Sequence, residues 1–338
     1  MKINSIQVLR ALAAWAVVLY HFGRETTSSF GSFFALYGNF GVDVFFVISG
    51  FIMYHVISAR EPDVKTFVVD RTFRIVPAYW IAISLFVIEK FLFPQAFAYS
   101  DWSLGSLLSS MFFIPVNNPS GIGPFPPLVV GWTLNVEMFF YALLYVCFLF
   151  GRFKFIVCCL TLMVLPYVYD REWFYGSIFG TRKLYEFVFG IVIGYSYAKL
   201  PSVRQWLLRN PAFGASLLPP AFALLYLDRD GMRLLSSGMF VVSFLLLEDF
   251  LNMYCSTLVK FFVRLGELSY STYLFHMIII GMVIGMFGAP SGGIDFRTIL
   301  EWLLVVFLTL SMSVFGFKVI EMSPLVKKMK VSLLSYVR

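Results

Sequence analysis

Two ionisable residues lie at opposite ends of the first apolar stretch of the chain, Ser5 to Phe22. Arg10 and His21 are eleven positions apart, which on an α-helix is about three turns and a rise of about 16 Å. They are therefore expected on one helix face, about half a bilayer core apart. An ionisable group inside a membrane helix is costly and usually faces a cavity. The alternative is that each side chain simply reaches a different membrane surface.

Two carboxylates fall at positions where they could act on such a histidine. Asp43 lies near the start of the second apolar segment, at a depth similar to His21, and a carboxylate beside an imidazole fixes its tautomer and raises its basicity. Asp43 as the N-cap of that helix is the alternative. Glu137 lies about one and a half turns inside the fourth segment. An unpaired carboxylate there is costly, so we expect Arg, His or a substrate hydroxyl as its partner.

A pair of arginines, Arg71 and Arg74, ends the loop that follows the second segment. Residues at i and i+3 share a helix face, and the guanidinium fork makes paired hydrogen bonds with phosphate. This spacing favours a phosphate site. Anchoring of the chain by two exposed arginines on the inner side is the alternative.

The segment beginning at Gly266 is unusually polar for a membrane helix, with Ser269, Tyr270, Ser271, Tyr273 and His276. Its hydroxyls could simply bond to neighbouring helices. His276 is the exception, because it lies in mid-segment among apolar residues. Trp132, at the start of the fourth segment, has an alternative role in the aromatic belt at the membrane interface.

The composition places these residues in a membrane. Of 338 residues 59% are hydrophobic and 13% charged, about half the charge of a soluble domain. The first apolar run has no small-residue cleavage site, which argues against a signal peptide. We predict an all-α, polytopic helix bundle of about ten transmembrane helices, at residues 5–22, 40–57, 75–93, 131–150, 154–169, 183–198, 211–227, 234–250, 268–287 and 298–319.

The basic residues orient this bundle. With the N-terminus inside, 18 of the 26 Lys and Arg residues fall on the inner side, so both termini are predicted to be cytoplasmic. The net charge of +7 then reflects orientation and does not indicate nucleic-acid binding. The other eight basic residues are Arg24, Lys90, Arg171, Arg182, Lys183, Arg229, Arg233 and Arg297.

Residues 1–338 are predicted to form a single transmembrane domain with no appended soluble domain. The long outer loop 94–130 is rich in Pro and Gly, which predicts an irregular segment that acts as a lid or re-entrant element, or alternatively as a passive cap. The four cysteines lack metal-ligand spacing, and we expect no metal. A Gly-rich phosphate loop and a G-x-S-x-G elbow are also absent from the sequence.

Five stretches, in order, make the chain resemble the integral-membrane acyltransferase-3 family over nearly its whole length. Arg10 and His21 are similar to the family's basic residue and histidine in the first helix, and Gly41–Phe51 to its second-helix signature. Arg71–Arg74 matches its R-x-x-R motif. Trp132–Glu137 is similar to W-S-L-x-x-E, with Thr133 in place of Ser, and Gly266–His276 resembles its late Ser/Tyr/His helix.

The resemblance implies transfer of an acyl group, commonly acetyl, from cytoplasmic acyl-CoA to a hydroxyl of an extracytoplasmic or lipid-linked glycan. The opening helix also resembles the exopolysaccharide-modifying, ExoZ-type branch. A multi-pass protein of the bacterial cytoplasmic (inner) membrane is expected, in contact with membrane lipid and with polysaccharide-assembly proteins as partners, and without nucleic acid.

The resemblance also implies roles for the residues. Arg10, Arg71 and Arg74 are expected to bind acyl-CoA, His21 to act as general base, and Asp43 or Glu137 to orient its imidazole. An acyl-histidine intermediate remains an alternative. We assign substrate binding to Trp132, Ser269, Tyr270, Tyr273 and His276.

A second function fits the same side chains, because His, Asp and Glu along a pore also form a proton relay. A proton-coupled transporter or flippase of a lipid-linked sugar is therefore the alternative. It has no CoA to bind, so the pair Arg71 and Arg74 distinguishes the two functions. A purely structural membrane protein would not need the ionisable residues Arg10, His21 and Glu137 in its apolar segments.

Overall fold

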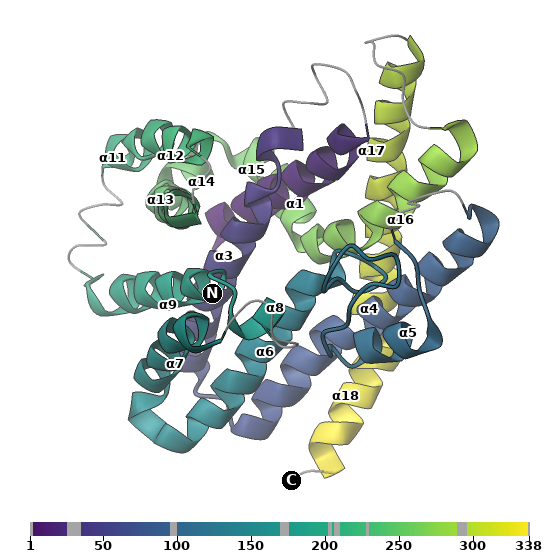
Figure 1. Ribbon diagram of the computed structural model, residues 1–338. Coiled ribbons are helices and arrows are strands. Elements are labelled where there is room, and N and C mark those ends of the chain that lie inside the picture. The colour runs from purple at the N-terminus through teal and green to yellow at the C-terminus, as the bar shows by residue number, and fades with distance from the viewer. Residues whose placement is uncertain are drawn as a thin grey trace.

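The computed structural model describes residues 3–25, 35–94, 100–169, 176–201, 205, 210–227, 230–288 and 296–336. This part of the chain is helical and contains no strand, as the all-α prediction required. In Figure 1, α1 and α3 lie near the centre, with α11, α12 and α13 on one side and α4, α5 and α6 on the other.

Each of the ten predicted segments is occupied by helix. The corresponding elements are α1 (Asn4–Arg24), α3 (Phe40–Arg60), α4 (Val64–Leu92), α6 (Gly131–Cys147), α7 (Lys154–Val168), α9 (Leu184–Lys199), α11 (Pro211–Ser216) with α12 (Leu218–Tyr226), α13 (Asp230–Leu246), α16 (Ser269–Phe287) and α17 (Phe296–Gly316). Shorter elements connect them: α5 (Leu104–Met111), η1 (Phe148–Phe153), α8 (Gly176–Phe179), α14 (Glu248–Tyr254), α15 (Ser256–Glu267), η2 (Phe317–Glu321) and α18 (Pro324–Tyr336).

Fewer than ten of these helices are long and apolar enough to cross a bilayer. Six helical stretches among the described residues are long and apolar enough, or seven when α13 and α14, bent by 52°, count as one span. Part of the shortfall is a matter of length, because α9, with 16 residues, and the stretch Pro211–Tyr226 are shorter than the ~17–25 residues that a spanning helix needs. In addition, α6 and α7 count together as one stretch of 38 residues, Gly131–Val168. The structure thus supports a multi-pass membrane protein, while ten spans and cytoplasmic termini remain predictions.

The centre of the bundle depends on close contact between α3 and α9. A Cβ at Gly50 would lie 2.2 Å from the Phe187 carbonyl oxygen, and one at Gly190 only 2.0 Å from the Val47 carbonyl oxygen. Small residues let membrane helices approach until their backbones touch. The helix α3 runs through Gly50 without interruption.

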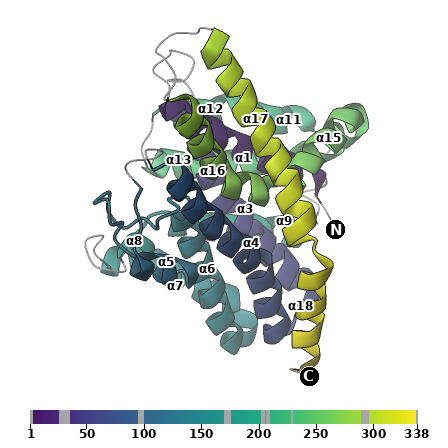
Figure 2. The same cartoon turned by 90° about the vertical axis from the view of Figure 1, so that its right-hand side faces the viewer.

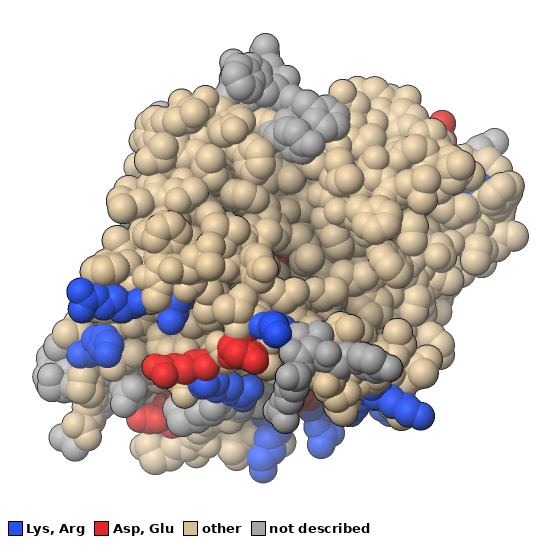
Figure 3. Space-filling view, turned by 90° about the horizontal axis from the view of Figure 1, so that it is seen from below, with Lys and Arg blue, Asp and Glu red and all other residues tan. Residues whose placement is uncertain are grey.

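Large apolar side chains cover much of the surface. Leu149 and Tyr167 are each 85% exposed and Phe296 is 82% exposed. Seen from below, most of the Lys and Arg residues in view gather in a band near one margin, and the rest of that face is largely uncharged (Figure 3). Apolar surface on this scale is expected where lipid rather than water surrounds the protein.

The loop 94–130 is more ordered than predicted. Residues 104–111 form α5, which begins with a capping box in which Ser103 and Ser106 bond to each other's backbone N–H groups. The prediction of an irregular segment is therefore wrong for this stretch and holds for 112–130, where Gly121 and Gly123 have φ of 80° and 99°. Residues 95–99 of the loop lie outside the described residues.

The C-terminal helix packs at one end of α4 (Figure 2). Lys330 of α18 forms an ion pair of 2.7 Å with Asp70, next to Arg71. The end of α4 that carries Arg71 and Arg74 and the helix at the C-terminus are therefore on the same side of the bundle. Six residues of the charge analysis, Lys2, Arg171, Arg204, Arg209, Arg229 and Arg338, lie outside the residues whose side chains are described.

The contact between α3 and α9 predicts the effect of adding one methyl group. Gly190→Ala should force the two helices apart and destabilise the protein by about 1–3 kcal/mol, lowering the midpoint of thermal unfolding in detergent. Gly105→Ala is the matched control, because its Cβ would meet only the Ser103 hydroxyl at 3.9 Å. Equal midpoints for the two variants would show that the helices do not touch here.

Candidate functional site

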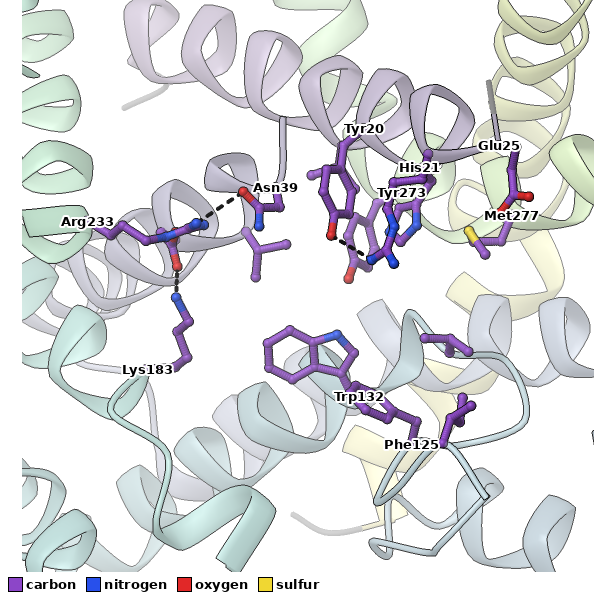
Figure 4. Close-up of a pocket in the computed structure, with 16 residues that line it drawn as sticks. Tyr20, His21, Glu25, Asn39, Phe125, Trp132, Lys183, Arg233, Tyr273 and Met277 are labelled. Atoms are coloured by element: carbon purple, nitrogen blue, oxygen red, sulfur yellow. Dashed lines mark hydrogen bonds and ion pairs between the residues drawn. The ribbon is translucent and has the colours of Figure 1, made fainter. Parts of the chain in front are cut away.

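A cavity of about 930 Å³ opens among α1, α3, α6, α13 and α16, beside the start of α9 (Figure 4). We call it the histidine pocket, because His21 forms part of its wall. His21 and Tyr273 lie on one side of the opening, and Lys183 and Arg233 lie across from them (Figure 4). Its walls consist of Val17, Tyr20, His21, Arg24, Glu25, Asn39, Val42, Asp43, Ile122, Phe125, Val129, Trp132, Lys183, Arg233, Tyr273 and Met277.

His21 lies in the last turn of α1, and its nearest rings are Tyr20 and His276. The centroid of the His21 ring lies 4.9 Å from that of Tyr20 and 5.2 Å from that of His276. The sequence predicted that Asp43 or Glu137 would orient this imidazole. The structure places Asp43 in the same pocket but gives its oxygens to other partners, and it places Glu137 in a different pocket.

Asp43 is held by two cations. One carboxylate oxygen pairs with Lys183, and the other accepts hydrogen bonds from Arg233, at 2.8 Å from Nε and 2.5 Å from Nη2. Asp43 is only 1% exposed, and burial of a carboxylate requires such pairing. It is not the N-cap of α3 either, because that position is Asn39, which bonds to Arg233. Asp43 therefore fixes the far wall of the pocket and does not orient His21.

Lys183 and Arg233 are the residues that sequence reasoning missed. Each stands at or near the start of an apolar helix, α9 or α13, and both were predicted on the same outer side as Asp43. Their shared predicted side was the one indication in the sequence that they could meet. It did not predict the contacts, because Lys183 and Arg233 are 140 and 190 positions from Asp43 in the sequence, and spacing along one helix says nothing about such distant contacts.

A second cavity, of about 200 Å³, contains all three predicted phosphate-binding arginines, Arg10, Arg71 and Arg74. We call it the arginine pocket. Four of the predicted residues join them there, from α6 and α16. These are Glu137, Ser269, Tyr270 and Tyr273.

A chain of contacts crosses the arginine pocket. Glu137 accepts hydrogen bonds from the hydroxyls of Tyr141, at 2.5 Å, and Ser49, at 3.2 Å. The Arg71 guanidinium lies 6.0 Å from the centre of the Tyr141 ring, within cation–π range. Arg10 bonds to Gln7 at 3.3 Å. The expected partners of Glu137 were Arg, His or a substrate hydroxyl, and the structure supplies two protein hydroxyls.

Tyr273 belongs to both pockets. Its hydroxyl lies 2.8 Å from the Thr133 hydroxyl and donates to the Val130 carbonyl at 3.1 Å, so α16 is tied to the start of α6. Tyr273 and Val42 are the residues that line both the arginine pocket and the histidine pocket. Thr133, which replaces the family's Ser, keeps the hydroxyl that this contact uses.

The remaining predicted residues divide between structural contacts and the pockets. Tyr270 donates to the Ile75 carbonyl at 2.8 Å, which is the helix-to-helix role offered as its alternative, although its ring also lines the arginine pocket. Ser269 is buried there. Trp132 lines the histidine pocket rather than an outer belt. His276 lies behind the wall of that pocket, beside His21.

The long loop closes one side of the histidine pocket. Ile122, Phe125 and Val129 are part of its lining, and Phe125 lies next to Trp132 across the opening in Figure 4. A segment of irregular backbone inside a membrane protein is tolerated where it lines a cavity. The position agrees with the predicted lid better than with a passive cap.

Comparison with known proteins identifies the class. The acyltransferase-3 family, described as an acyltransferase domain, matches residues 3–317, and the chain belongs to this family. It is 33% identical over 295 residues to the exopolysaccharide production protein ExoZ of Rhizobium meliloti, covering 81% of this chain and 86% of that protein.

A second relative is the peptidoglycan O-acetyltransferase OatA of Listeria monocytogenes, 28% identical over 152 residues. This match covers 41% of the chain and 23% of OatA. No solved structure matches the chain. The protein is thus a multi-pass membrane acyltransferase of the acyltransferase-3 family, similar to ExoZ over most of its length.

The ion pairs of Asp43 with Lys183 and Arg233 predict that replacing Asp43 destabilises the protein more than replacing Asp70. Asp43→Asn should destabilise the protein by about 1.5–3 kcal/mol, because it weakens charge-assisted bonds in a buried setting. Asp70→Asn breaks the ion pair with Lys330. Asp70 is 30% exposed and Lys330 is 35% exposed, so this change should lower the stability by less than about 1 kcal/mol. Thermal unfolding of both variants in detergent measures this; equal losses would contradict the structural role of Asp43.

Proposed function

We propose that the protein is located in the bacterial cytoplasmic membrane and transfers an acyl group from acyl-CoA to a hydroxyl of an extracytoplasmic or lipid-linked glycan. The acyl group we propose is acetyl. One observation carries the proposal. Two pockets, one with three arginines and one with a histidine, share Tyr273 and Val42 in their walls. A donor rich in phosphate and an acceptor hydroxyl require these two environments.

The arginine pocket suits the donor. CoA carries a pyrophosphate and a further phosphate, and arginine binds such groups through paired hydrogen bonds. A neighbouring cavity of about 420 Å³ shares Arg71 and Tyr141 with the arginine pocket and adds Lys65. The phosphates would bind at this entrance, with the narrow pantetheine arm extending past Arg10 toward Tyr273.

The histidine pocket suits a saccharide acceptor. Trp132, Tyr20 and Phe125 offer aromatic surface, while Asn39 and the cationic side chains offer polar contacts, a combination typical of small-molecule sites. The two relatives, an exopolysaccharide production protein and a peptidoglycan O-acetyltransferase, favour a glycan acceptor and an acetyl group. Other polysaccharide-assembly proteins would be its partners.

The chemistry assigned to His21 is general base catalysis. Its imidazole takes the proton of the acceptor hydroxyl while the oxygen attacks the thioester carbonyl. The carbon–sulfur bond then breaks, and the imidazolium returns the proton to the CoA sulfur. The steps balance without a further reactant.

The first test measures release of CoA from acetyl-CoA by the purified protein in detergent with a glycan acceptor. His21→Ala should lower the rate at least about 100-fold, because it removes the base. Arg71→Ala should chiefly raise KM for acetyl-CoA, because it removes a phosphate contact. Arg152→Ala is the matched control: that arginine lies at 4.7 Å over the Phe153 ring, in the turn between α6 and α7.

Each outcome of this test has a clear meaning. Release of CoA that survives in His21→Ala would contradict the assigned base. Absence of acetyl-CoA binding to the wild-type protein would contradict the donor site and point to a transporter.

Tyr273 provides a separate prediction. If its ring separates the donor from water in the histidine pocket, Tyr273→Ala should raise hydrolysis of acetyl-CoA relative to transfer by about tenfold or more. Thr133→Ser keeps the hydroxyl that contacts Tyr273 and should leave this ratio unchanged. The ratio is measured as acetate against acetylated product, and an unaltered ratio in Tyr273→Ala would show that the ring is not the barrier.

A further inference from the structure

His276 presents an unusual situation for a buried polar group. It is 0% exposed, and neither ring nitrogen has a hydrogen-bond partner among the described residues. A buried polar atom without a partner costs about 1–3 kcal/mol, so such atoms are rare and require an explanation. Its neighbours in sequence, Leu274, Phe275, Met277 and Ile278, have buried, apolar side chains, and only the backbone of Thr272 and Tyr273, about one turn earlier, comes near the imidazole among the preceding residues of its helix.

Among the described residues, no hydrogen-bond partner holds either ring nitrogen of His21. A histidine that acts as a base usually has its second nitrogen held by another group, which fixes the tautomer. The two carboxylates predicted for this role are engaged elsewhere, Asp43 with Lys183 and Arg233 and Glu137 with two hydroxyls. In the described part of the chain no cluster of three or more His, Cys, Asp or Glu residues could hold a metal ion.

The distance between the two rings fits a direct bond. Each imidazole nitrogen lies about 1.2 Å from its ring centroid, so an N–H···N bond of about 2.9 Å between facing nitrogens needs centroids about 5.3 Å apart. The observed separation is 5.2 Å, with the ring planes tilted by 43°. The separation therefore matches the one that such a bond requires once a nitrogen of each ring faces the other.

We propose that His276 is a positioning residue for His21: it accepts a hydrogen bond from the nitrogen of His21 that faces away from the acceptor. The other His21 nitrogen is then unprotonated and free to take the acceptor's proton, and the imidazolium that forms stays bonded to neutral His276. His276 gains no proton in the cycle. The role resembles that of the carboxylate in a Ser-His-Asp triad, and it rests on the function proposed above for His21.

The kinetic experiment compares replacements of His276 that differ in hydrogen-bonding atoms. His276→Phe keeps a ring but no nitrogen; His276→Asn and His276→Gln place a polar atom near Nδ1 and Nε2, respectively. We expect His276→Phe to lower kcat about 10–100-fold, the range seen for loss of an orienting partner, with KM for acetyl-CoA unchanged. Either Asn or Gln should restore most of it. Full activity of the Phe variant, or no rescue by either amide in folded protein, would overturn the proposal.

A spectroscopic measurement separates this proposal from the proposed function. The chain has only three histidines, so ¹⁵N-histidine labelling in lipid bilayers gives a spectrum in which the tautomers of His21 can be followed by solid-state NMR. His276→Phe should change the His21 tautomer ratio. His55→Phe should not, because His55 stacks on Phe51 at 6.1 Å, outside both pockets.

The outcomes are distinct. An unchanged His21 signal in His276→Phe would overturn the positioning role whatever the enzyme does. If His276→Phe changes the His21 signal but the wild-type protein releases no CoA, the contact between the two histidines is supported and the acyl-transfer function is contradicted.

Discussion

The backbone contact between α3 and α9 is the constraint on which the rest of the site depends. Lipid gives helices no hydrophobic reason to associate, so close packing has to hold them together. Gly50 and Gly190 remove the two side chains that would keep these helices apart. That contact brings the starts of both helices to one place, and there Asp43 meets Lys183. A pair of glycines in mid-helix thus determines where a charged cluster forms about two turns away.

Residues of α16 line both pockets. Tyr270, Tyr273 and His276 follow one another at intervals of three residues, so each is next to the following one on the helix surface, and Tyr270 and His276 are about 120° apart around the axis. Tyr270 lines the arginine pocket, Tyr273 lines both pockets, and His276 lies beside His21. The helix that looked merely polar in the sequence therefore contributes side chains to both pockets and to the surroundings of His21.

Local spacing explains which features could be predicted from sequence. The positions of the ten helical segments followed from apolar runs, and the grouping of Arg71 with Arg74 from their separation of three residues. The partners of Asp43 could not be predicted in this way, because its contacts depend on how α9 and α13 pack against α3. The number of spans also remained open, since a 16-residue helix such as α9 can cross a bilayer only where the surrounding protein shortens the path.

Some buried polar groups in this bundle have hydrogen-bond or ion-pair partners and others have none in the described part of the chain. Whether a group without a partner has a functional role depends also on whether it lies near one of the two pockets. Asp43 is fully paired and acts as a brace. Glu89 and His276 both have buried polar atoms without partners among the described residues. Glu89, however, lines neither the histidine pocket nor the arginine pocket, whereas His276 adjoins the one imidazole that faces the larger cavity. An unsatisfied group becomes evidence for function where a reacting group lies within reach of it.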